Sequence, residues 1–141
     1  MKIEQFVAQS LGEWRSMRSS HSLAFKQFED IVSYIKISQI EVSNIKVREL
    51  VSKTTYSEKD IISPFKVTWA ADTNWGEGEK ANDMKGSTLL IPVIAKKKEG
   101  VMLRSIGYTE KIMALSKYKF VCDGTLILTT EYSESVAEER I

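Results

Sequence analysis

The chain has 141 residues, a length that suits a single domain with a sizeable hydrophobic core. Hydrophobic residues make up 43% and charged residues 28% of the sequence, as in an ordinary soluble globular protein. The formal net charge of +1 argues against binding of nucleic acid or an anionic membrane through overall charge. The single cysteine, Cys122, excludes an intramolecular disulfide and a cysteine-rich metal site.

No segment indicates export or a membrane span. The start of the chain lacks the long apolar run of a signal peptide. The longest apolar run, Leu89 to Ala95, contains Pro92 and is too short to cross a bilayer. We therefore expect a soluble protein from a reducing, intracellular compartment.

The N-terminal part of the chain predicts two short helices and two strands. Apolar residues recur at helical spacing over residues 2–10, and Gly12 is expected to end this first helix. Strand-like alternation follows to Leu23, and residues 31–40 are rich in β-branched side chains. A second helical pattern covers residues 47–54, with Ser43 or Asn44 as its N-cap. Residues 53–63 read as a polar connection.

From Pro64 onward the chain is predicted to be mostly β. Strand patterns begin near residues 65, 87, 101, 117 and 124, and residues 136–141 start another strand. Residues 74–86 form a turn-rich loop, and Asp123 with Gly124 marks a hairpin turn. Pro92 favours an edge strand or a bulge. The sequence therefore predicts a mainly β protein, a single domain over residues 1–141, whose antiparallel sheet closes into a barrel or sandwich.

Motifs for catalysis are scarce. His21 is the only histidine, and no nucleophile-elbow glycine pattern surrounds any serine. One histidine and one cysteine cannot build a typical structural zinc site, so no metal is expected. The stretch GEGEK at 76–80 lacks the spacing of a phosphate-binding loop, and the lysines at 96–98 are typical of a solvated hairpin end.

The stretch EWRSMRSSHSLAF, residues 13–25, raises a question about its two faces. Alternation puts Trp14 and Arg18 on one side with only serines between them. If that side is inward, Arg18 needs a carboxylate or an anionic ligand as its partner. If it is outward, Arg18 is an ordinary surface residue, and both readings remain open.

Two further tryptophans and an acidic C-terminal stretch are candidates for a binding site. Trp69 shares the apolar face of its strand and is either a core residue or an aromatic wall for a planar ligand. Trp75 lies in a polar, glycine-rich loop, where function and burial are equally good explanations. Among the C-terminal acids, one that faces a cavity would bind nitrogen donors or supply a proton. Cys122 is read as a small buried or half-buried side chain.

Several segments together resemble the S-type phycobiliprotein lyases, the CpeS/CpcS-like bilin lyases. The segments occur in the family's order over residues 2–141: EWRSMRSSHSLAFKQFE, VTWAADTNW, KGSTLLIPV, MLRSIGYTEK and DGTLILTTEYSESVAEERI. Family members continue beyond the Glu-Glu-Arg motif with further strands, whereas this sequence ends at Ile141. The resemblance therefore leads us to expect a bilin-binding barrel that lacks the family's C-terminal strands.

The resemblance implies a fold and an activity. The fold is an antiparallel β-barrel of the lipocalin and fatty-acid-binding type, with a short N-terminal helix and one further helix. The activity is attachment of a chromophore: the lyase binds a linear tetrapyrrole such as phycoerythrobilin non-covalently and delivers it to a cysteine of a phycobiliprotein β subunit, as in phycoerythrin, where a thioether forms. The bilin is a substrate, and no permanently bound cofactor is expected.

The resemblance also implies roles for individual residues. Trp14, Trp69 and Trp75 would contact the bilin, and Arg18 would pair with a propionate, with Arg140 as a further binding residue. Glu139, and with it Glu131, would accept hydrogen bonds from the pyrrole N–H groups or protonate the bilin. Cys122 would not carry the chromophore, since the acceptor cysteine belongs to another protein.

The remaining expectations concern partners and place. Family members are often dimers, so a homodimer is an expectation from the resemblance alone, as is the cytoplasm of a cyanobacterium that builds phycobilisomes. A lipocalin-like bilin carrier without transfer activity is the first alternative. A structural or assembly partner of phycobiliproteins, with a barrel filled by its own side chains, is the second.

Overall fold

The computed structural model describes residues 1–71, 85–105 and 114–141. Its elements, in chain order, are α1 (Ile3–Ser10), β1 (Gly12–Ser22), β2 (Gln27–Gln39), α2 (Ile45–Ser52), the 3₁₀ turn η1 (Glu58–Asp60), β3 (Phe65–Ala71), β4 (Gly86–Lys96), β5 (Glu99–Arg104), β6 (Ala114–Phe120), β7 (Leu126–Glu131) and β8 (Val136–Arg140).

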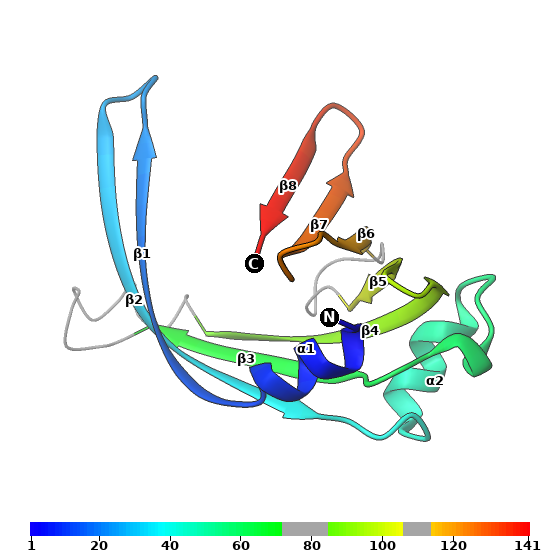
Figure 1. The fold of residues 1–141 in the computed structure, drawn as a ribbon. Coiled ribbons are helices and arrows are strands. Elements are labelled where there is room, and N and C mark those ends of the chain that lie inside the picture. Colours follow the sequence, from blue (N-terminus) through cyan, green and yellow to red (C-terminus); the bar gives the residue numbers. More distant parts are fainter. Residues whose placement is uncertain (72–84, 106–113) are drawn as a thin grey trace.

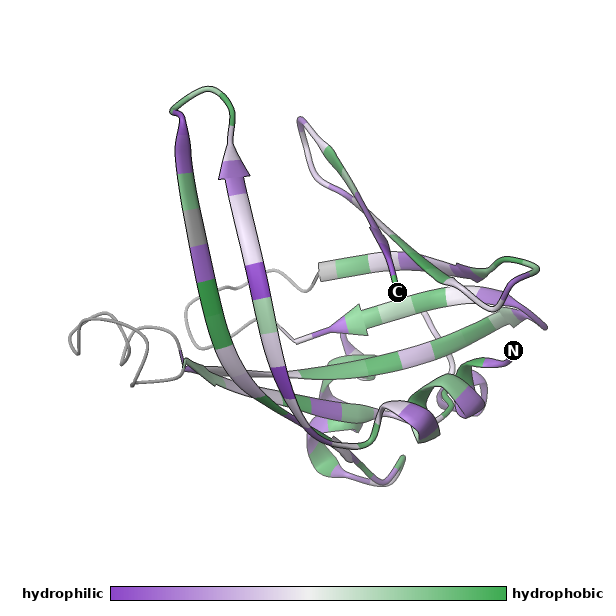
Figure 2. Ribbon diagram, turned by 60° about the vertical axis from the view of Figure 1, so that its left-hand side comes forward, coloured by the Kyte–Doolittle hydropathy of each residue, from purple (hydrophilic) through white to green (hydrophobic). Residues whose placement is uncertain are grey.

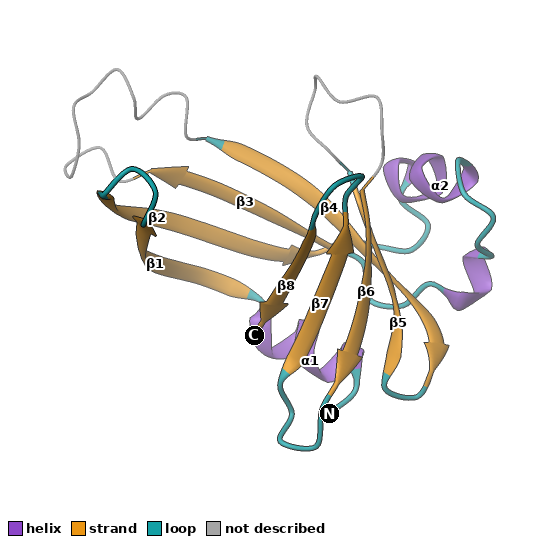
Figure 3. Cartoon of the chain, turned by 90° about the horizontal axis from the view of Figure 1, so that it is seen from above, coloured by secondary structure: helices purple, strands orange, loops and turns teal. Residues whose placement is uncertain are grey.

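The strands form one eight-stranded sheet in the order β1 to β8, and each strand is antiparallel to the next. The sheet is strongly curved: the β1–β2 hairpin rises on one side, β3 and β4 form the floor, and β7 and β8 rise on the other side (Figure 1, Figure 3). The prediction of a mainly antiparallel β protein with two helices is confirmed. Within the described ranges no strand pair joins β1 to β8, so closure into a barrel stays a prediction.

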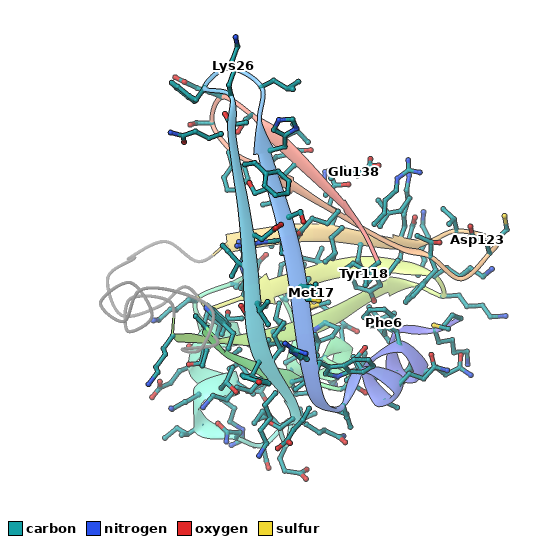
Figure 4. All side chains as sticks on the ribbon, turned by 90° about the vertical axis from the view of Figure 1, so that its left-hand side faces the viewer. Phe6, Met17, Lys26, Tyr118, Asp123 and Glu138 are labelled. Atoms are coloured by element: carbon teal, nitrogen blue, oxygen red, sulfur yellow. The ribbon has the colours of Figure 1, made fainter. Side chains whose placement is uncertain are left out.

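The first helix lies inside the curve of the sheet. Ile3 and Val7 of α1 are buried against a cluster that includes Phe65, Met102 and Tyr118. Phe6 of the same helix packs against this cluster, and Figure 4 shows it near Tyr118. We call the sheet face that carries this cluster the concave face, and the opposite face the convex face.

The second helix covers the convex face. Val47 and Val51 of α2 are fully buried against a second cluster that contains Ile91 and Leu103. The side chain of Asn44 accepts a hydrogen bond from the Lys46 backbone N–H and caps this helix, which settles the choice between two predicted caps. Because β4 and β5 are covered on both faces, they read as nearly continuous apolar runs.

Pro92 lies in a central strand, but at a point where that strand has a local edge. The paired part of β3 ends at Phe65, opposite Leu90. Beyond it, the Ile62 backbone N–H donates to the Pro92 carbonyl, which shows that the imide nitrogen of Pro92 faces the side that β3 no longer occupies. The proline therefore removes no ladder hydrogen bond, as the predicted edge position requires.

The β1–β2 hairpin is longer than the sequence predicts. Strand β2 begins at Gln27 rather than at Ile31, because residues 27–30, three of which are polar, pair with the end of β1. The Ser19 hydroxyl donates to the Asp30 carboxylate at 2.6 Å across this pair. Lys26, at φ 49°, makes the turn at the tip (Figure 4).

The tip of this hairpin is hydrophobic and exposed (Figure 2), with Leu23 82% and Phe25 76% accessible.

Among the described residues, no helix has the length and the apolar run that crossing a bilayer requires.

Candidate functional site

Strand register decides which residues share the concave face. Trp14, Ile35, Trp69 and Gly86 are successive partners across β1 to β4. Partners that lie directly opposite in antiparallel strands point to the same side of the sheet. Trp69 lies four residues from Phe65, whose side chain packs under α1 on the concave face. Both tryptophans therefore belong to the concave face.

Arg18 follows Trp14 by four residues on β1 and so shares that face. It lies opposite Ile31 of β2, and its side chain is exposed. Within the part of the chain that the structure describes, it forms no ion pair. The structure thus gives the inward orientation of Arg18 and supplies no carboxylate from the described residues to neutralise it.

The indole of Trp69 packs closely against Gly86 of the neighbouring strand. A Cβ atom built on Gly86 would lie 2.3 Å from Cζ2 of Trp69 and 2.6 Å from its Cε2, so any side chain at position 86 would displace the ring. Trp69 is nevertheless 38% exposed. It is therefore an oriented aromatic surface rather than a buried core residue.

Trp14 has a structural partner. Its indole Nε1–H donates to the Ser10 carbonyl at 2.8 Å, one of the carbonyl groups that the end of α1 leaves without an intrahelical partner. The side chain remains 51% exposed. Trp14 thus joins α1 to β1, while part of its ring stays available to a ligand.

The two acids predicted for catalysis lie on opposite faces. Glu139 is opposite Leu128, which is opposite Tyr118, so it belongs to the concave face; it is exposed. Glu131 lies on the convex face, where its carboxylate is 3.6 Å from Nζ of Lys117. The predicted pair therefore does not meet at one site, although the role of each acid stays a prediction.

Arg140 and Trp75 complete the predicted set. Arg140 is on the convex face, and its Nε lies 3.0 Å from the Glu138 carboxylate. Because Arg140 does not lie on the face that carries Trp69 and Arg18, its predicted role in bilin binding gains no support and stays a prediction. Trp75 lies outside the described residues.

A buried polar pair lies on the concave face, on β6 and β7. The hydroxyl groups of Ser116 and Thr130, which are opposite each other on β6 and β7, are 2.5 Å apart. Only one hydroxyl hydrogen is needed for that bond, so the pair keeps a donor for another acceptor.

Burial, together with the nearby carboxylate of Glu4, raises the pKa of Tyr118 to about 12.

Sequence reasoning missed one charged residue of this face, Arg104. The alternation in GVMLR gives the signal: Met102 is in the concave cluster, Leu103 is in the convex one, and Arg104 must be concave again. It is half-buried.

The other chemistry-bearing residues lie elsewhere. His21 is on the convex face in edge contact with Phe28, with ring centroids 6.1 Å apart. Cys122 is exposed in the turn between β6 and β7, so the prediction of a buried or half-buried side chain is wrong. Among the described residues no group of three or more histidine, cysteine, aspartate or glutamate side chains could hold a metal ion.

These features define a mainly antiparallel β protein whose curved sheet carries an oriented indole and two arginines on its concave face. A family model described as "CpeS-like protein" matches residues 2–141, and the chain belongs to this CpeS-like family. The resemblance predicted from the sequence is confirmed.

The relatives carry lyase names. The chain is 39% identical to "Chromophore lyase CpcS/CpeS 3" of Trichodesmium erythraeum, over 100% of this chain and 81% of the relative. It is 34% identical to "Putative phycoerythrobilin lyase CpeS" of Microchaete diplosiphon, over 100% of this chain and 62% of the relative. The solved structure of the S-type phycobiliprotein lyase CPES from Guillardia theta matches with a TM-score of 0.83 and 32% identity, covering 100% of this chain and 75% of that one.

Proposed function

We propose that this protein is a phycobiliprotein chromophore lyase, which binds a linear tetrapyrrole non-covalently and transfers it to a cysteine of a phycobiliprotein β subunit. Membership of the CpeS-like family and the lyase names of its relatives support the enzyme class. The observation that carries the proposal at the level of residues is the shared concave face of Trp69 and Arg18.

The chemistry of a bilin fits these residues. A linear tetrapyrrole is flat and π-rich and carries two propionates, so it needs an aromatic surface and cationic groups. Trp69 offers an indole whose orientation is fixed by Gly86. Arg18 offers a planar guanidinium that suits a carboxylate and has no carboxylate partner among the described residues.

The transfer step is an addition in which the acceptor thiolate attacks the ethylidene side chain of the bilin. A carbon–sulfur bond forms, the carbon–carbon double bond is consumed, and a proton is taken up by the tetrapyrrole. Glu139 is the acid we assign to hold or deliver that proton, because it is the member of the predicted pair on the concave face. The other contribution of the protein is to position the bilin and exclude water from it.

The test is a titration of the purified protein with phycoerythrobilin, followed by addition of the apo-β subunit. A shifted, sharpened bilin band that moves onto the subunit as a zinc-fluorescent covalent adduct is the expected result. No change in the bilin band would contradict binding and would favour a structural role.

A bilin carrier without transfer is the second candidate, and one observation favours it. Glu131 is paired with Lys117 on the convex face, which leaves a single predicted acid on the binding face. In the same experiment, a carrier gives the shifted band but no adduct on the subunit.

The setting of this activity is part of the proposal. Phycobiliproteins are assembled in the cytoplasm of cyanobacteria, so we place the protein there, with the bilin as substrate rather than resident cofactor. A homodimer, proposed from the family resemblance, is tested separately by light scattering.

A further inference from the structure

Three residues with binding chemistry share the concave face: Arg104 lies in the row of Phe65, four residues before Trp69, and Arg18 lies four residues beyond the row that Trp14 and Trp69 share. In a sheet whose strands follow one another antiparallel, β1, β3 and β5 all run in the same direction. Arg18 lies in the second half of β1, Trp69 is near the end of β3, and Arg104 is the last residue of β5. The strand order places Trp69 between the two arginines.

The surroundings of Arg104 are apolar on its own face. It lies opposite Leu90 of β4 and follows Met102 on β5, and both belong to the concave cluster or pack against it. Half-burial among apolar neighbours removes part of the water around a guanidinium, which is costly unless an anion replaces that water.

No described carboxylate serves as that anion. The ion pairs among the described residues join Lys96 with Glu99, Lys117 with Glu131, and Arg140 with Glu138, and none of them involves Arg104. Glu139, on the concave face, lies in the row of Gly100, four residues before Arg104 on β5. Within the described ranges, Arg104 is therefore a half-buried cation without an ion-pair partner.

We propose that Arg104 binds a carboxylate of the ligand, as a second guanidinium in addition to that of Arg18 and on the other side of Trp69. The inference rests on the proposed function, in which the ligand is a linear tetrapyrrole with two propionates. Arg104 would act on affinity and on the way the tetrapyrrole lies across Trp69, because a planar guanidinium forms two directed hydrogen bonds to one carboxylate.

The experiment compares Arg104→Gln with the parent protein using two probes, phycoerythrobilin and its dimethyl ester, in which both propionates are masked. We expect Arg104→Gln to raise the Kd for the free acid by about tenfold, since a hydrogen bond to a charged group typically contributes about that much. The Kd for the ester should be the same in both proteins. Arg104→Lys, which keeps the charge but loses the planar fork, should lie between them.

Arg48→Gln is the matched control, since it removes the same charge from an exposed position on α2. It should leave both Kd values unchanged. Thermal unfolding of each variant checks the fold, and Arg104→Met, which keeps an unbranched apolar stem, replaces Arg104→Gln if that variant unfolds.

Two results would overturn the inference while the parent still binds bilin. One is an unchanged Kd for the free acid in Arg104→Gln; the other is an equal loss for acid and ester, which would make Arg104 a packing residue. If the parent protein binds neither probe, the proposed function itself fails, and the role of Arg104 fails with it.

Discussion

The indole of Trp69 on β3 rests on Gly86 of β4, in a contact that leaves no space for a methyl group on the glycine. The absence of a side chain at Gly86 therefore determines where the Trp69 ring lies on the concave face. A pair of this kind, in which an aromatic residue covers a glycine on the next strand, also stabilises the sheet locally.

Replacing Gly86 by Ala should tilt Trp69 away from the sheet. We expect weaker bilin binding, a shift in tryptophan fluorescence and a loss of stability of about 1–3 kcal/mol from overpacking. Titration with phycoerythrobilin and urea unfolding measure the two effects. In a Trp69→Ala background, Gly86→Ala should cost no further affinity; an additional loss there would show that Gly86 acts by another route.

Replacing Arg18 by Gln should weaken bilin binding by about tenfold, because a charge-assisted hydrogen bond to a propionate is lost. Arg15→Gln is the control: it is the same substitution on the same strand, but on the convex face. Equal affinities for the parent and Arg18→Gln proteins would leave Arg18 without a role in binding.

Glu139→Gln should keep bilin binding but slow the transfer to the β subunit, since the amide cannot deliver a proton. Glu131→Gln should transfer at the parent rate, because its carboxylate lies on the convex face beside Lys117. Adduct formation over time separates the two variants. A Glu131→Gln protein that lost transfer, with Glu139→Gln unaffected, would reverse the assignment.

Trp14→Phe removes the hydrogen bond from Nε1 to the Ser10 carbonyl and keeps an aromatic ring in place. The bond is exposed, so we expect a loss of about 0.5 kcal/mol in the free energy of unfolding. Urea denaturation measures it. An unchanged midpoint would mean that water replaces the indole at the end of α1 without cost.

Burial of Tyr118 should make the folded protein less stable at high pH. Its pKa is raised from 10.0 to about 12 in the folded protein. The unfolded chain therefore releases the phenol proton first, so the stabilising contribution is complete below pH 10 and is lost as the pH rises toward 12. Urea unfolding between pH 9 and pH 11 should show a steeper decline for the parent than for Tyr118→Phe; parallel declines would contradict the assignment.

Alternation within one strand could be predicted from the sequence, but pairing between strands could not. The shared face of Trp14 and Arg18 follows from spacing alone, and the apolar partners of Phe65 show which side that face is. Hydrophobic periodicity likewise located both helices. The start of β2 was missed, because three of the four residues 27–30 are polar and the segment becomes a strand only by pairing with β1.

The separation of Glu131 from Glu139 shows the same limit at the site. The turn between β7 and β8 fixes the register, and a shift of one residue would exchange the faces of β8. Because the alternation of faces within β7 cannot be continued through the turn into β8, the sequence did not show that the two acids lie on opposite faces. The role of Gly86 was hidden for the same reason, since it depends on a residue of the adjacent strand.

The position of α1 limits the routes by which a ligand can reach the concave face. It packs beside the beginnings of β3 and β7 and the end of β6, and so occupies one end of the concave face. A chromophore held against Trp69 would be reached from the other end, where β1, β3 and β5 finish, or through the side between β1 and β8, which no strand pair closes within the described residues. The acceptor subunit would present its cysteine at one of these two openings.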